Sequence, residues 1–324
     1  MKRREFVKKS GGLTFGILGG ASSFVACKGN NASDAAKAAK AVVTESKPWF
    51  KQSLAQWSVN KELFAGDLDH LDFAKYSADL GFEGVEYVSA FFKDKVEDKD
   101  YLNEMNKRAK DSNVEQLLIM VDGEGDLASE DKKVRETTIE NHKKWLAAAS
   151  ALGCHSIRVN LFGEMYDKTK WIEYSTEGLG ALSEIAKPSN INVIVENHGW
   201  ISSHAPSLVQ VMKNINMDNC GTLPDFGNFC MKRSDGEKWG KECLEEYDKY
   251  KGVDELMPYA KAVSAKSHDF GPDGKETKID YAKMMDIVKK HGYRGYVGTE
   301  YEGSRLSSKE GVIATRDLLK TLNV

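Results

Sequence analysis

The strongest constraint on the fold is the regular alternation of short β-rich runs with longer segments of helical periodicity from residue 53 onward. Eight candidate strands lie at residues 53–58, 84–88, 115–121, 156–161, 191–197, 221–225, 262–267 and 295–300. Candidate helices lie near residues 69–80, 100–112, 130–151, 172–187, 205–214, 239–260, 280–290 and 308–322. Strict alternation favours parallel pairing with right-handed crossovers. Eight strand–helix units therefore predict an α/β fold in the form of a closed (β/α)8 TIM barrel.

A doubly wound open sheet is the alternative fold, because it shows the same alternation. That fold usually carries a glycine-rich dinucleotide-binding fingerprint after its first strand, and residues 57–60 (WSVN) do not resemble one. The length of 324 residues does not require two domains, since α/β barrels form single domains of about 250 residues. We therefore assign residues 50–324 to one barrel.

The N-terminal segment is expected to be an export signal, residues 1–27. Residues 3–8 (RREFVK) resemble the twin-arginine motif, and residues 11–26 form a mildly apolar, glycine-rich segment that is too short to span a membrane. Val25-Ala26-Cys27 resembles a lipobox, which makes Cys27 the candidate lipidation site, although cleavage by an ordinary peptidase stays open. The polar, alanine-rich residues 28–49 are expected to form a linker. These features predict an exported bacterial protein, either periplasmic or a membrane-anchored lipoprotein, rather than a cytoplasmic one with a basic tail.

The formal charge argues against nucleic acid as a partner. The whole chain carries a net charge of −3, and removal of residues 1–26, which hold five basic side chains and one acidic, leaves −7. A surface of that sign repels phosphate backbones. Contact with a membrane is expected only through a lipid anchor at Cys27, and the sequence does not determine the oligomeric state.

The remaining cysteines, Cys154, Cys220, Cys230 and Cys243, lack the short paired spacings of a zinc ribbon. Each is expected to act as a small buried apolar residue. A disulfide between Cys230 and Cys243 is open in an oxidising compartment.

Three of the predicted strands end in a carboxylate. Glu196 ends the run INVIVE, Asp225 ends GTLPD and Glu300 ends YVGTE. The active site of a barrel lies at the carboxyl ends of its strands, so these three side chains are expected to converge. Pairing with Arg158 or Lys266 would explain any one of them, but three converging carboxylates repel one another unless a cation lies among them. We therefore predict a divalent metal site.

Other polar and aromatic residues fall at the same rim. The candidate substrate-binding residues are Trp57, Glu86, Arg158, Asn160, His198 and Asn228. Aromatic rings also gather at the strand ends, where flat faces can stack on the C–H faces of a sugar. Several of these rings must instead close the top of the core. The pattern favours a small-molecule sugar or sugar derivative as the ligand.

The spacing of three strand ends carries a family resemblance. The chain is similar to the xylose isomerase-like barrels of the sugar phosphate isomerase/epimerase superfamily over roughly residues 50–324, through the motifs IVENH (194–198), LPDFGN (223–228) and VGTEYEG (297–303). In that family one divalent ion is held by a Glu, an Asp, a His and a Glu on the fifth to eighth strands. The resemblance implies Glu196, Asp225 and Glu300 as the matching ligands.

The seventh strand departs from the family pattern. Where the family commonly reads His-x-Lys, this chain reads Ser264-Ala265-Lys266. We expect His268, which has the same side-chain parity, to supply the fourth metal ligand. His198 is the other candidate, and water is the third. A site of carboxylates and water favours Mn²⁺ or Mg²⁺, with Zn²⁺ or Co²⁺ as further possibilities.

The resemblance implies a metal-dependent sugar isomerase or epimerase. Glu196 and Glu300 would act as the catalytic acid and base on opposite faces of the substrate, next to a carbonyl group. Lys266, with Arg158, would stabilise the enediolate that forms. Reprotonation on the other face gives epimerisation, and reprotonation on the neighbouring carbon gives isomerisation.

Three other functions compete with this one. A lyase or hydratase could use the same metal site to eliminate the aglycone of a keto-glycoside. A non-catalytic sugar-binding lipoprotein would explain the missing histidine at position 264, but it would not need opposed carboxylates. A nuclease of the apurinic endonuclease type is disfavoured by the net charge and by the few histidines near the rim, which are His198, His204 and His268.

Overall fold

The computed structural model describes residues 48–164 and 167–323. The expected export signal with Cys27, and the expected linker up to residue 47, lie outside the described residues. No helix in the described part of the chain combines the length and the apolar character needed to cross a membrane.

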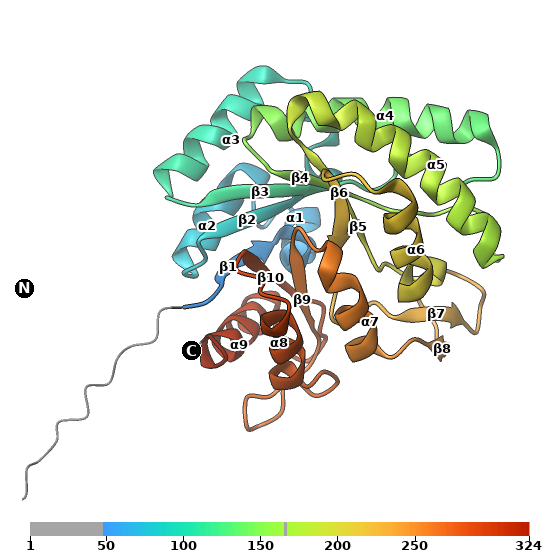
Figure 1. The fold of residues 1–324 in the computed structure, drawn as a ribbon. Helices are drawn as coiled ribbons and strands as arrows, with labels where there is room; N and C mark the ends of the chain where they lie inside the picture. The colour runs from blue at the N-terminus through green and yellow to red at the C-terminus, as the bar shows by residue number, and fades with distance from the viewer. Residues whose placement is uncertain (1–47, 165–166, 324) are drawn as a thin grey trace, which may run out of the picture. The chain divides into compact units, whose positions relative to one another are not determined.

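Within the described residues, eight parallel strands form the central sheet (Figure 1). They are β1 (Lys51–Ala55), β2 (Gly84–Val88), β3 (Glu115–Met120), β4 (Ser156–Val159), β5 (Asn192–Glu196), β6 (Cys220–Leu223), β9 (Val263–Ser267) and β10 (Tyr296–Tyr301). Their order is β6-β5-β4-β3-β2-β1-β10-β9. Parallel bridges from Thr222 to Ala260 and from Asp225 to Ser264 join the two outer strands. The sheet therefore closes, and the predicted (β/α)8 barrel is confirmed.

Helices surround the barrel and cover its outer face (Figure 1). Those described are α1 (Asn60–Ala65), α2 (Phe73–Asp79), α3 (Lys99–Asp111), α4 (Lys132–Ala151), α5 (Lys168–Ala186), α6 (Ala205–Ile215), α7 (Lys249–Leu256), α8 (Tyr281–Lys290) and α9 (Ser308–Thr321). Several begin at an aspartate whose side chain accepts a hydrogen bond from the first turn, as Asp98 does for α3 and Asp280 for α8. Ser307 and Glu310 form a capping box at the start of α9.

The two-residue period of a strand decides which side chains enter the barrel. On β5, Val193 and Val195 belong to the large cluster that includes residues of the helices, whereas Ile194 packs inside with Leu118 and Leu223. Glu196 has the parity of Ile194, so it also points inward, at the carboxyl end of the strand. This alternation therefore places a carboxylate inside the barrel at the carboxyl ends of its strands.

One element differs from the sequence prediction. The helix expected at 239–260 begins only at Lys249, where Asp248 caps α7, and residues before it belong to an antiparallel hairpin of β7 (Cys230–Arg233) and β8 (Cys243–Glu246). A disulfide joins Cys230 to Cys243, with their Cα atoms 5.8 Å apart. Strand pairing and a cross-link are non-local, so helical periodicity did not reveal them. The sequence did not decide whether Cys230 and Cys243 form a disulfide, and the structure contains it.

Candidate metal and substrate site

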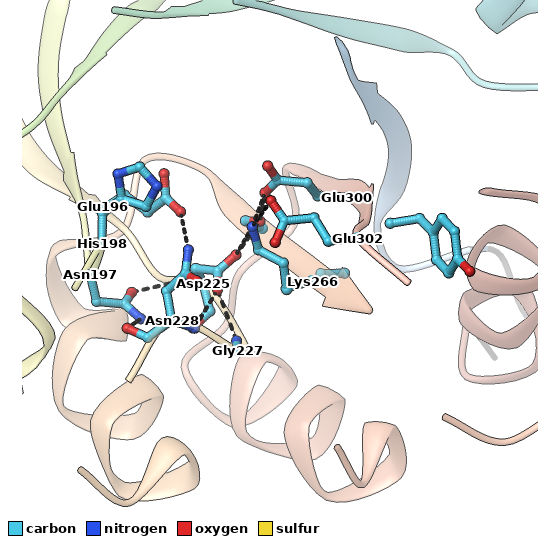
Figure 2. Close-up of polar contacts among 12 residues, drawn as sticks. Glu196, Asn197, His198, Asp225, Gly227, Asn228, Lys266, Glu300 and Glu302 are labelled. Carbon is cyan, nitrogen blue, oxygen red and sulfur yellow. Dashed lines mark hydrogen bonds and ion pairs between the residues drawn. The ribbon is translucent and has the colours of Figure 1, made fainter. Parts of the chain in front are cut away.

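Three carboxylates converge at the carboxyl ends of the strands (Figure 2). They belong to Glu196 at the end of β5, Asp225 just after β6 and Glu300 on β10. One oxygen from each lies within 4.8 Å of the others, and all three residues are buried. Among the described residues, these three make the one group of this kind that could hold a metal ion.

Asp225 is held rigidly by its own loop. Its Oδ1 accepts hydrogen bonds from the backbone N–H groups of Gly227 at 2.8 Å and Asn228 at 2.7 Å. The Ser264 hydroxyl lies 2.6 Å from Asp225 Oδ2 and 3.0 Å from Glu300 Oε2. Because a hydroxyl has a single proton, Ser264 bridges the two carboxylates and donates to one of them at a time. Ser264, which stands where the family has a histidine, therefore contacts two of the three clustered carboxylates.

Lys266 brings a buried ammonium to one side of the group. Its Nζ lies 3.1 Å from Glu300 Oε2, 3.2 Å from Glu302 Oε1 and 3.9 Å from Asp225 Oδ2 (Figure 2). The β9–β10 register pairs Lys266 directly with Glu300. The ion pair between these two residues is thus set by strand pairing.

Arg158 on β4 plays the equivalent part on the other side. Its Nε lies 3.1 Å from Glu196 Oε2, an ion pair without the alignment of a hydrogen bond. Its second nitrogen donates to Asp122 Oδ1 at 2.8 Å, while Asn228 donates to Glu196 Oε1 at 2.9 Å. Each of the two glutamates therefore has its own cation, Glu196 with Arg158 and Glu300 with Lys266.

Burial dominates the electrostatics of these carboxylates. It raises the pKa of Asp225 to about 8, although Lys266 acts to lower it. Burial also raises the pKa of Glu196 against the effect of Arg158, and that of Glu300 against the effect of Lys266. The two cations therefore offset the cost of burying the three negative charges only in part.

The charge balance and the ligand types fit a divalent cation. The two buried cations of Arg158 and Lys266 meet five carboxylates, those of Asp122, Glu196, Asp225, Glu300 and Glu302. Converging carboxylates repel one another unless a cation lies among them. Carboxylate oxygens are also the ligands that hard divalent ions prefer. A divalent ion held by the three clustered carboxylates would offset most of the excess negative charge.

Two histidines were candidates for the fourth metal ligand. Among the described residues, neither has a ring nitrogen in the cluster formed by Glu196, Asp225 and Glu300. His268 lines the pocket and faces Gly227, and its backbone N–H donates to Glu276. His198 Nδ1 lies 2.7 Å from Asn160 Oδ1. Since a carbonyl oxygen only accepts, Nδ1 carries the proton and Nε2 is left as an acceptor. Burial lowers the pKa of His198 to about 3, so the ring is neutral.

A pocket of about 1080 Å³ opens above the carboxylates. Five of the predicted substrate-binding residues line it, namely Trp57, Arg158, Asn160, His198 and Asn228. Glu300, Glu302 and His268 also line it. Glu196, Asp225 and Lys266 are buried and are not among the described lining residues. The pocket and the carboxylate group therefore meet at Glu300.

Glu86, the sixth candidate substrate-binding residue, is not among the described residues that line the pocket. It lies in the middle of β2, accepts a hydrogen bond from the Ser53 hydroxyl at 2.6 Å and packs against Gly298 inside the barrel. A residue two positions from the strand end lies one layer below the rim, although its parity is the same. Burial raises the pKa of Glu86 to about 8, so this carboxyl group is mainly protonated at neutral pH.

Sequence reasoning did not assign roles to Asp122, Ser264, Glu302 or the hairpin residues Lys238 and Trp239. Glu302 follows Glu300 by two residues, and this shared parity was a usable signal. The hairpin residues line the pocket but lay inside or beside the predicted helix, so no local signal placed them there.

The fold and the site define a parallel α/β barrel with a buried acidic centre at the carboxyl ends of its strands. Residues 74–322 match the family of xylose isomerase-like TIM barrels, and the chain belongs to that family. No curated protein matches the sequence.

Solved structures with a similar fold include sugar epimerases. A D-psicose 3-epimerase in the presence of D-fructose has a TM-score of 0.63 at 14% identity, and the match covers 85% of this chain and 100% of that chain. The 3-keto-D-glucoside 4-epimerase of E. coli has a TM-score of 0.62 at 13% identity, covering 78% and 94%. An AP endonuclease of family 2 from Brucella melitensis has a TM-score of 0.58 at 19% identity, covering 81% and 97%. At these identities the likeness shows a shared fold.

Proposed function

We propose that this protein is a divalent-metal-dependent isomerase or epimerase that acts on a sugar by removing a proton next to a carbonyl group. The observation that carries the proposal is the convergence of Glu196, Asp225 and Glu300 within 4.8 Å, with a cation beside each glutamate. Membership of the xylose isomerase-like family supports it. The sugar epimerases among similar structures support the substrate class.

Glu196, Asp225 and Glu300 would hold the ion, with Mn²⁺ or Mg²⁺ favoured by an all-oxygen set. Ser264, which bridges two of these carboxylates, occupies the place of the histidine ligand in the family pattern. When bound, such an ion supplies Lewis acidity that eases removal of a proton beside a carbonyl.

The chain's own groups suit an exchange of protons between two carboxylates. Glu196 and Glu300 come from different strands, β5 and β10, and each is a carboxylate that can accept or return a proton. One would accept the proton from carbon while the other returns a proton. Lys266 and Arg158 would stabilise the negative oxygen of the enediolate, because preorganised charges act strongly in a buried site.

The pocket residues would orient the sugar. His198 offers Nε2 as an acceptor for a hydroxyl, since Asn160 fixes the proton on Nδ1. Asn228 is already committed to Glu196 through one N–H and has further hydrogen-bonding capacity. Trp57 provides a flat wall for a C–H face of the ring.

Exchange of the substrate C–H with solvent deuterium tests this proposal. We expect the Mn²⁺-loaded protein to exchange the proton next to the carbonyl of a ketohexose, and Glu196→Gln and Glu300→Gln to slow exchange by at least about 100-fold. Glu115→Gln is the matched control. Glu115 is exposed, pairs with Lys51 and begins β3, at the end of the barrel opposite to the three clustered carboxylates. Elemental analysis should find one divalent ion per chain. Exchange that survives both site substitutions would refute the acid–base assignment.

A lyase or hydratase reaction on keto-glycosides is the second candidate. The pocket of about 1080 Å³ has room for a glycoside, the substrate that this reaction needs, because pockets of about 300–1,000 Å³ enclose drug-sized ligands. Release of the aglycone from a keto-glycoside would identify this reaction, and exchange without release would identify the epimerase. Sugar binding with neither result would identify a non-catalytic binding protein.

We also propose that the protein is exported and lipidated at Cys27, on the motifs in residues 3–8 and 25–27. Mass spectrometry of the mature N-terminus would test this. A diacylated Cys27 is expected, and an unprocessed Met1 would contradict export.

A further inference from the structure

The hairpin of β7 and β8 is held in shape by a disulfide between its strands and by contacts at its tip. The disulfide runs diagonally across the hairpin, from Cys230 at the start of β7 to Cys243 at the start of β8. Near the tip, the Arg233 guanidinium donates to the backbone carbonyls of Lys238 at 3.1 Å and Lys241 at 2.8 Å. The connecting residues 234–242 are therefore fixed by side-chain contacts as well as by strand pairing.

The tip docks on aromatic residues beside the proposed catalytic site. The Trp239 ring centroid lies 4.3 Å from that of His198 and 6.3 Å from that of Phe162. Lys238 Nζ lies 4.2 Å from the centre of the Phe162 ring, within the range of a cation–π contact. Gly199 lies next to the tip, since a Cβ there would be in van der Waals contact with the Trp239 ring at 3.4 Å, and its φ of 84° favours glycine. The hairpin is thus a wall of the pocket.

Trp239 still has 43% of its surface exposed, and it lines the pocket together with Lys238. Lys238 forms no ion pair with a carboxylate of the described residues, so its N–H groups are available to a ligand. His198 connects this wall to the polar floor, because it touches Trp239 with its ring and Asn160 with Nδ1. A ring stacked on Trp239 would therefore lie beside a sugar bound at the floor.

The size of the pocket leaves room for two rings. Its volume of about 1080 Å³ lies just above the range of about 300–1,000 Å³ that encloses drug-sized ligands. Trp57 and Phe64 form a separate aromatic part of the lining, with their ring centroids 6.2 Å apart.

We infer that the disulfide-closed hairpin forms a second ring-binding subsite, in which Trp239 stacks on the ring attached to the reacting sugar and Lys238 donates hydrogen bonds to it. The substrate is then a glycoside rather than a free monosaccharide. This inference rests on the proposed function for the identity of the reacting ring. The attached ring is a sugar or an aryl group, since both offer a flat face to tryptophan.

Binding of unreactive ligands tests the subsite independently of catalysis. 1,5-Anhydroglucitol, a non-reducing glucosyl disaccharide and nitrophenyl glucoside have no free anomeric centre and cannot open to the carbonyl form that the proposed reaction needs, so their dissociation constants can be measured by calorimetry on the Mn²⁺-loaded full chain. We expect the two glycosides to bind at least tenfold more tightly than 1,5-anhydroglucitol. Trp239→Ala should reduce that preference about tenfold, which corresponds to about 1.4 kcal/mol, and Trp239→Phe should retain most of it.

Leu244→Ala is the matched control, because Leu244 lies on the same hairpin, is 58% exposed and faces away from the described lining of the pocket. It should leave the preference unchanged. A response limited to the nitrophenyl compound or to the disaccharide would support the subsite and identify the ring as aryl or sugar.

Equal affinity of the wild type for 1,5-anhydroglucitol and both glycosides would overturn the inference, as would equal effects of Trp239→Ala and Leu244→Ala. If deuterium exchange fails while the Trp239-dependent preference remains, the proposed function fails and the subsite stands. If exchange succeeds without the preference, only the subsite fails.

Discussion

Replacement of Lys266 by Met probes the charge balance at the centre of the site. The Lys266 side chain is 2% exposed, and its ammonium lies between Glu300 and Glu302 with Asp225 close by. Methionine fills a similar volume without a charge. The substitution therefore leaves buried carboxylates without their nearest cation.

Removal of one partner from a buried ion pair costs about 3–5 kcal/mol, because the remaining charge is desolvated without compensation. For a barrel of this size, each kcal/mol lowers Tm by roughly 2–4 °C. We expect Lys266→Met to lower Tm by about 10 °C in EDTA. Mn²⁺ should recover most of this loss, because an ion bound by the carboxylates replaces the missing positive charge and stabilises the native state by mass action.

Thermal unfolding in EDTA and in saturating Mn²⁺ measures both effects. Lys75→Met is the matched control, because Lys75 forms an exposed pair with Asp79, and such pairs contribute at most about 1 kcal/mol. Lys266→Met should also bind Mn²⁺ more tightly than the wild type. A loss of Tm that is equal with and without Mn²⁺ would refute the carboxylates as the ion's ligands. No loss in EDTA would refute the role of Lys266 in charge compensation.

Two further predictions concern Glu86 and the hairpin disulfide. The folded-state pKa of Glu86, about 8, lies above its unfolded value, so its stabilising contribution is complete below about pH 4.5 and is lost as pH rises to 8. That loss is on the order of 4 kcal/mol, and Glu86→Gln should flatten the fall of Tm across this range in EDTA, whereas parallel curves would contradict the shift. Replacing Cys230 and Cys243 by Ser removes a cross-link over 13 residues that constrains the open hairpin by about 3 kcal/mol. Trypsin should then cut residues 234–242 on the order of 100-fold faster while the barrel stays intact, and an unchanged rate would show that docking alone holds the tip.

Much of the fold and part of the site were predictable because they depend on local patterns. Inside β5, alternating apolar residues place Ile194 and Glu196 on the same face, and the carboxyl ends of parallel strands meet at one rim. These local properties predict that Glu196, Asp225 and Glu300 converge, and the structure brings them together. It failed for Glu86, because parity gives the face but not the depth along the barrel.

The structure adds most where distant segments meet. His268 as the fourth metal ligand stays a prediction, while the hydroxyl of Ser264 lies between Asp225 and Glu300. The segment before α7 has helical periodicity, yet its cross-strand partners and the disulfide place part of it in a hairpin. Periodicity has no information about such partners.

The sequence by itself determined the barrel class and the three strand-end carboxylates, because strand length, residue parity and strand termini are properties of neighbouring residues. Only the tertiary structure decided that Arg158 pairs with Glu196, that Lys266 pairs with Glu300, and that the hairpin brings Trp239 to the pocket. Those relations are distances between side chains far apart in the chain, and the closure of the barrel establishes them.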